Sequence, residues 1–218
     1  MGDPWLGPRE IALQETMKVA KRRGDFRLGR FVAKRLLATR YPELPLARLE
    51  ILPDEDGAPC CYEGEQPLPV SLSLSHRGSY GFAAMRVGAH SLGCDLELVE
   101  PRSPAFMRDY FTEHEQAVFV AHPVDAGALW ANVFWSAKES VLKALRTGLR
   151  RDARGLEVEV EGLGVEVEGF EVRAAQWSPV CVRDLEAQRD YHGFWQRRGE
   201  QILTLASSDR LRIGAECI

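Results

Sequence analysis

The chain has 218 residues, of which 45% are hydrophobic and 28% are charged, and this composition is typical of a soluble globular protein. Its net charge of −4 at pH 7 argues against nucleic-acid binding through a broad basic surface. No apolar run approaches the length of a membrane span and no signal peptide is recognisable, so we expect neither membrane insertion nor secretion. The five cysteines form no C-x-x-C pair, which predicts reduced thiols in a cytoplasmic protein rather than disulfides or a zinc site.

The first forty residues predict two helices, over 10–23 and 25–40, separated by Gly24 and Asp25. Four cations recur at three- and four-residue steps and would form a basic stripe along the second helix: Arg23, Arg27, Arg30 and Lys34. Such a stripe is usually a solvated face, but it could also hold an anionic ligand.

The next segment, 48–69, is rich in proline and glycine and predicts loops around a short strand at 49–52. An antiparallel meander of three strands is then expected at 70–75, 81–87 and 92–98. The first of these strands alternates leucine or valine with serine, so we expect its serines to face outward. His76 would lie at the edge of this meander.

Two acidic residues of the third strand, Asp95 and Glu97, are predicted to share one face, because alternate residues of a strand point the same way. Adjacent like charges repel unless water or a cation lies between them. A solvent-facing acidic edge and a divalent-metal site are both compatible with this pattern.

Prolines at 101 and 104 predict a stiff linker, and we place a boundary there between an N-terminal half, 1–98, and a C-terminal half, 99–218. A capping box at 112–115 opens a helix that runs to residue 120, and a loop at 122–127 leads to a further helix at 134–145. Trp135, Glu139 and Lys143 follow one another at one-turn spacing on that helix. Taken alone, the last two are an ordinary surface ion pair.

The remainder predicts strands: a pair within 156–173, then 180–185 and 201–206. The expected fold is therefore α/β (α+β), with two halves that each combine helices with a small antiparallel sheet. Carboxylates from two elements, together with nearby Lys, Arg and His, could hold Mg²⁺ and phosphate oxygens. That set of residues suits phosphoryl transfer.

Three segments carry a resemblance to a known family: L-S-L-S-H-R-G at 72–78, L-G-C-D-L-E at 92–97 and W-S-A-K-E-S-V-L-K at 135–143. They resemble the motifs of 4′-phosphopantetheinyl transferases of the long, pseudo-dimeric type that includes the surfactin-synthetase activator. G-R-F-V-A-K at 29–34 fits the same pattern. The ordered pairing of G-x-D-x-E with W-x-x-K-E-x-x-x-K is specific, whereas either motif alone is weak.

The resemblance implies two similar halves related by a pseudo-twofold axis, with coenzyme A in the cleft between them and a monomeric enzyme. The enzyme would transfer phosphopantetheine to a serine of an acyl or peptidyl carrier protein. It implies Mg²⁺ ligands at Asp95, Glu97 and Glu139, and catalytic roles for Glu139, Lys143 and His76. It implies coenzyme A contacts at Arg23, Arg30, Lys34, Ser75, His76 and Lys143.

One departure from the family is Ala58 in Gly57-Ala58-Pro59, where relatives often carry a cation. Two other interpretations remain open. A metal-dependent nuclease would need E-x-K on one strand, but Leu98 and Val99 follow Glu97. A catalytically inactive coenzyme A or carrier-protein binder would be expected to have lost a ligand or Lys143, and neither loss is seen.

Overall fold

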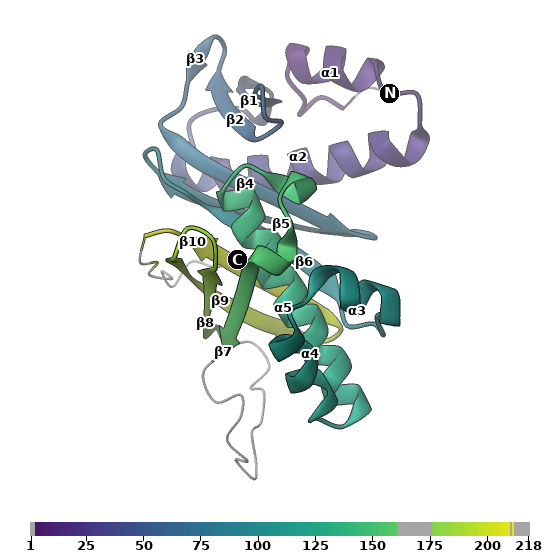
Figure 1. Ribbon diagram of the computed structural model, residues 1–218. Helices are drawn as coiled ribbons and strands as arrows, with labels where there is room; N and C mark the ends of the chain where they lie inside the picture. The colour runs from purple at the N-terminus through teal and green to yellow at the C-terminus, as the bar shows by residue number, and fades with distance from the viewer. Residues whose placement is uncertain (1–2, 161–175, 210, 212–218) are drawn as a thin grey trace.

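The computed structural model describes residues 3–160, 176–209 and 211 (Figure 1). The helices are α1 (Pro8–Glu15), α2 (Ala20–Arg40), α3 (Pro104–Tyr110), α4 (Glu113–Val120) and α5 (Val124–Ala144). The strands are β1 (Leu49–Pro53), β2 (Pro59–Glu63), β3 (Gln66–Pro67), β4 (Val70–Arg77), β5 (Tyr80–Val87), β6 (Gly93–Leu98), β7 (Leu156–Val160), β8 (Ser178–Asp184), β9 (Arg189–Arg198) and β10 (Gln201–Ser207). The mixed α/β class expected from the sequence is confirmed. Of the strand pair expected within 156–173, only β7 lies inside the described residues.

The strands form three antiparallel sheets, with the orders β1-β2-β3, β4-β5 and β6-β10-β9-β8-β7. The predicted three-strand meander is therefore wrong, because β6 leaves the β4–β5 hairpin and pairs with β10. Gly93 permits this arrangement: a Cβ there would lie 1.8 Å from Ser140 O, so the bare backbone of β6 can approach α5. Although β6 precedes the expected boundary at residue 98, it belongs to the sheet formed otherwise by later strands.

In the N-terminal part, α2 packs against β1, β4 and β5 (Figure 1). The predicted break at Gly24 and Asp25 is wrong, since α2 continues through both residues. A helical glycine costs only about 1 kcal/mol relative to alanine, and packing of the apolar side of a long helix offsets that cost. The core beneath α2 consists of Ala33, Leu37, Leu49, Ile51, Cys61 and Leu72.

In the C-terminal part, α5 lies across β6 and β10 and forms the centre of the larger core. This helix begins at Val124, so the predicted loop at 122–127 is wrong beyond Pro123. Residues 129–138 of α5 are all buried. A helix that is buried on every side lacks the one-sided apolar stripe from which a helix start is recognised, which explains the error.

A buried ion pair joins α1, α2 and β1. The Lys34 ammonium pairs with the Glu10 carboxylate, and both side chains are 0% exposed. Glu10 also accepts hydrogen bonds from Gly7 N at 2.9 Å and Ile51 N at 3.0 Å, while Lys34 donates to Trp5 O at 2.8 Å. The prediction that Lys34 belongs to an exposed basic stripe is therefore wrong, because its charge neutralises a buried carboxylate.

The same contacts recur where α4, α5 and β7 meet. Lys138 Nζ lies 2.6 Å from Glu115 Oε2, again with both side chains 0% exposed. Glu115 accepts from Thr112 N and Val158 N, both at 2.9 Å, and Lys138 donates to Tyr110 O at 3.0 Å. In both ion pairs the glutamate accepts one hydrogen bond from the backbone three residues before it and one from a strand backbone. The repeat agrees with two similar halves, and the pseudo-twofold axis itself stays a prediction.

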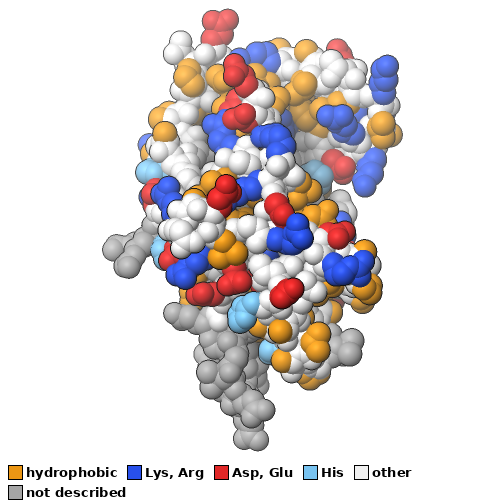
Figure 2. Space-filling view, viewed as in Figure 1, with side chains coloured by type: hydrophobic (Ala, Val, Ile, Leu, Met, Phe, Trp, Pro, Cys, Tyr) orange, Lys and Arg blue, Asp and Glu red, His pale blue; other side chains and the backbone are white. Residues whose placement is uncertain are grey.

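Positive and negative side chains are interspersed over the face that Figure 2 shows, as the net charge of −4 would lead one to expect. Within the described residues, none of the helices is both long enough and apolar enough to cross a membrane.

Candidate active site

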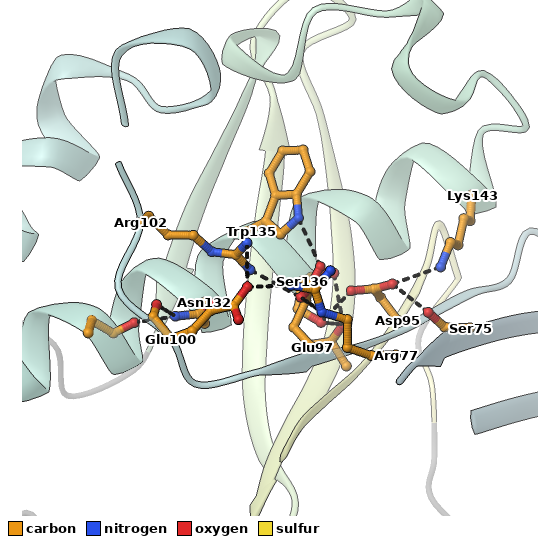
Figure 3. A network of polar contacts seen from close by, with 12 residues as sticks. Ser75, Arg77, Asp95, Glu97, Glu100, Arg102, Asn132, Trp135, Ser136 and Lys143 are labelled. Atoms are coloured by element: carbon orange, nitrogen blue, oxygen red, sulfur yellow. Dashed lines mark hydrogen bonds and ion pairs between the residues drawn. The ribbon is translucent and has the colours of Figure 1, made fainter. Parts of the chain in front are cut away.

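The predicted site residues meet where the end of β4, the middle of β6 and the last turns of α5 come together (Figure 3). Asp95 lies at the centre and is 4% exposed. Its Oδ1 accepts hydrogen bonds from Ser75 Oγ at 2.7 Å and Lys143 Nζ at 2.8 Å, and its Oδ2 accepts from Ser136 Oγ at 2.9 Å. Burial raises the pKa of Asp95, but the Lys143 charge and these hydrogen bonds outweigh burial and lower the pKa below its usual value. Asp95 is therefore ionised at neutral pH.

The serines of β4 were predicted to face solvent, and this prediction is wrong. Ser73 and Ser75 are both buried, and Ser73 Oγ accepts a hydrogen bond from Cys94 N at 2.9 Å. The leucine side of β4 packs on the N-terminal core while the serine side contacts β6. Both faces are covered because β4 lies between the two parts of the molecule, a contact that strand periodicity does not reveal.

Glu97 points to the same side of β6 as Asp95, as predicted. Its Oε1 accepts from Trp135 Nε1 at 3.2 Å, and its Oε2 accepts from Arg102 Nη2 at 3.1 Å (Figure 3). Arg77 lies 3.6 Å from the same oxygen. Burial and the charge of Asp95 nevertheless raise the pKa of Glu97, against the opposing effect of both arginines. The interpretation of this strand as a solvated acidic edge is wrong.

Glu139 and Lys143 do not form the ordinary surface pair that their spacing allows. Lys143 Nζ instead donates to Asp95 and, at 3.0 Å, to Cys94 O. Burial and then the negative charge of Asp95 raise the pKa of Glu139 to about 7; Lys143 opposes this shift and Glu97 adds to it. Three carboxylates thus share one region, in which Lys143 pairs with Asp95 while Arg77 and Arg102 pair with Glu97.

Residues 91–206, which include β6, α5 and β10, match the family model of the 4′-phosphopantetheinyl transferase superfamily. The match covers more than half of the 218 residues. The chain belongs to this superfamily. It is therefore a transferase of phosphopantetheine, and the predicted family is confirmed at this level. No curated protein matches the chain.

The remaining predicted residues of this transferase are spread more widely. His76 is exposed and follows Ser75 at the end of β4. Arg23 donates to Met17 O at 2.8 Å. Arg30 donates to Ile51 O at 3.0 Å, and burial lowers its pKa. These α2 arginines thus bind carbonyl oxygens of the N-terminal part.

The loop at 57–59 contacts residues on two sides. It carries Ala58 at the position where relatives often have a cation. Asp54 Oδ1 accepts from Ala58 N at 3.0 Å. The other oxygen of Asp54 pairs with Arg146, which lies just after the end of α5, and Arg146 Nε lies 3.7 Å from Asp56. A cation therefore does lie against this loop, but the C-terminal part supplies it.

In the part of the transferase that the structure describes, no group of three or more His, Cys, Asp or Glu side chains is arranged to hold a metal ion. Asp95 and Glu97 direct their oxygens to protein donors in this arrangement. The donor set still suits a hard cation chemically, because three carboxylates lie near one another, and burial together with the negative charge of Asp95 raises the pKa of both Glu97 and Glu139. Sequence reasoning missed Arg77, Arg102 and Ser136, although two of the three fall inside the quoted motifs.

Proposed function

We propose that this protein transfers the 4′-phosphopantetheine arm of coenzyme A to a serine hydroxyl of an apo acyl or peptidyl carrier protein. The reaction would require Mg²⁺ and release adenosine 3′,5′-bisphosphate. The observation that carries this proposal is the group of Asp95, Glu97 and Glu139 beside Lys143, within the segment that matches the superfamily. Coenzyme A would lie in the cleft between the two halves of a monomer of the surfactin-synthetase-activator type.

The three carboxylates are the proposed ligands for Mg²⁺, which takes oxygen ligands and, when bound, neutralises charge on the pyrophosphate. Glu139 is the proposed general base. Its pKa is about 7 in the metal-free protein, and a bound Mg²⁺ would keep the carboxylate ionised and able to accept a proton at neutral pH. The serine oxygen would bond to the phosphorus that carries pantetheine as the bond to the nucleotide's 5′-phosphate breaks. The hydroxyl proton would pass to Glu139.

Cations at the two ends of the site would bind the phosphates of coenzyme A. Lys143 and His76, with Ser75, are proposed for the pyrophosphate, and Arg30 with Arg23 for the remaining nucleotide phosphate. Lys34 does not belong to the proposed coenzyme A contacts, because its ammonium is fully buried against Glu10.

The assignment of Arg30 predicts that Arg30→Gln weakens coenzyme A binding about tenfold, as expected for loss of one charge-assisted hydrogen bond. Isothermal calorimetry measures the affinity. Arg35→Gln, an exposed change on the same helix, should alter it by less than about twofold. Because Arg30 also donates to Ile51 O, thermal unfolding of each variant accompanies the titration. An unchanged affinity in folded Arg30→Gln would remove Arg30 from the site.

The function itself is tested by incubating the protein with coenzyme A, Mg²⁺ and an apo carrier protein and weighing the carrier by mass spectrometry. A gain of one phosphopantetheine group that disappears with a chelator is expected. If coenzyme A binds but several different carriers gain no mass, the protein is instead a catalytically inactive binder.

A further inference from the structure

A chain of buried hydroxyl groups runs from Asp95 into β10. Ser136 Oγ lies 2.9 Å from Asp95 Oδ2 and 2.9 Å from Thr204 Oγ1. Thr204 Oγ1 lies 2.6 Å from Ser140 Oγ, one turn along α5 from Ser136. All three hydroxyl-bearing residues are 0% exposed. The chain thus links α5, β6 and β10 inside the core of the C-terminal part.

The direction of the hydrogen bonds follows from the ionisation of Asp95. An ionised carboxylate can only accept, so Ser136 must donate its single hydroxyl proton to Asp95. The single hydroxyl proton of Thr204 is then shared between Ser136 Oγ and Ser136 O, which lie 2.9 Å and 2.8 Å from Thr204 Oγ1, and Ser140 donates to Thr204 Oγ1. Ser136 donates directly to the carboxylate, and Thr204 and Ser140 stand behind it in series. Donors in series polarise one another and strengthen the last bond.

Packing alone gives no reason for this polar chain. Thr204 lies directly opposite Asp95 in the β6–β10 pair, between Ile202 and Ala206, which contribute apolar surface to the same core. Valine has the shape of threonine and would fill such a position without a buried hydroxyl that needs partners. The hydroxyls link α5 to β10 through the Ser136 and Thr204 carbonyls, and the first of them also holds Asp95.

We propose that Ser136 and Thr204 are positioning residues that fix the Asp95 carboxylate for a divalent cation. Ser75 and Lys143 already use Oδ1, and Ser136 uses Oδ2. A carboxylate has about four acceptor positions, so three protein donors leave about one, on Oδ2. Asp95 would then bind the cation through one oxygen held in a single orientation. This inference rests on the proposed function.

The test uses Mn²⁺ as a probe, followed by electron paramagnetic resonance on the whole protein with saturating coenzyme A. Thr204→Val removes the hydroxyl but keeps the shape, and should weaken Mn²⁺ binding about 2- to 10-fold, the equivalent of one net hydrogen bond. Thr204→Ser keeps the hydroxyl and should bind Mn²⁺ nearly as wild type does. In the transfer assay the half-saturating Mg²⁺ concentration should rise by the same factor for Thr204→Val. A purely structural role would lower only the active fraction.

Ser207→Ala is the matched control. Ser207 also lies on β10 and is 0% exposed, and it donates its hydroxyl proton to Ser91 O at 2.6 Å rather than to the chain that ends on Asp95. Its loss should reduce stability without changing Mn²⁺ affinity. If Thr204→Val does not fold, Ser136→Ala tests the same chain with the same expectation.

Unchanged Mn²⁺ affinity in Thr204→Val or Ser136→Ala, or an equal loss in Ser207→Ala, would overturn the inference. Failure of the wild-type protein to bind Mn²⁺ at all would instead count against the proposed function. The two failures are therefore distinguishable.

Discussion

Replacing Glu139 by glutamine is expected to lower the rate of phosphopantetheine transfer about 10²- to 10⁴-fold, the usual contribution of a general base. Glutamine has nearly the same size but cannot take up the serine proton. The mass of the carrier protein, followed over time, gives the rate. Glu159→Gln, an exposed change on β7, is the control and should leave the rate unchanged. A loss of less than about tenfold in folded Glu139→Gln would remove Glu139 as the base.

The same variant should also change how the stability of the metal-free protein depends on pH. The pKa of Glu139 rises from its ordinary 4.5 to about 7 on folding, so between these pH values the folded protein binds more protons than the unfolded chain. Stability of the metal-free protein should therefore fall as pH rises from about 4.5 to about 7. Glu139→Gln should lack this part of the fall. Urea unfolding at several pH values measures the difference, and identical profiles for the two proteins would contradict the raised pKa of Glu139.

Replacing Lys138 by methionine is expected to cost about 3–5 kcal/mol of folding free energy, because it leaves the Glu115 carboxylate buried without its cation. Denaturant unfolding measures the loss. Adding Glu115→Gln should restore much of the stability, since the double variant buries no charge. The exposed change Lys21→Met should stay within about 0.5 kcal/mol of wild type.

Lys34→Met should behave like Lys138→Met if the two ion pairs have equivalent roles in the two parts of the molecule. A cost below about 1 kcal/mol for Lys138→Met would show that the pair does not hold α4, α5 and β7 together. A large cost for Lys138→Met with none for Lys34→Met would contradict the equivalence of the two units.

Local sequence was a good guide to where short strands begin and end and to which residues share a face, because turn-forming residues bound the strands and side chains alternate along them. β1 and β5 lie within a residue or so of their predicted bounds, and Asp95 and Glu97 share a face as predicted. It did not reveal that some elements are covered on both sides. The start of α5 and the burial of the β4 serines were misjudged for that reason, since periodicity reports only a contrast between faces.

Lys34 and Lys143 show the same limit for charged residues. Both occur at helical spacing within basic or mixed-charge patterns, and both were expected to face a ligand. Lys34 is instead fully buried against Glu10, whereas Lys143, which stays the proposed pyrophosphate contact, also binds Asp95. Their spacing could not reveal these partners, which lie 24 and 48 positions away in the chain.

The sequence by itself determined the α/β class, the family and the residue types of the site, because short motifs keep their spacing whatever surrounds them. Only the tertiary structure decided which donors hold those residues. Pairing of β6 with β10 brings Thr204 opposite Asp95, and packing of α5 on both strands brings Ser136 to the same carboxylate. Such contacts join segments far apart in the chain. They arise from how buried surfaces fit together, which no local pattern encodes.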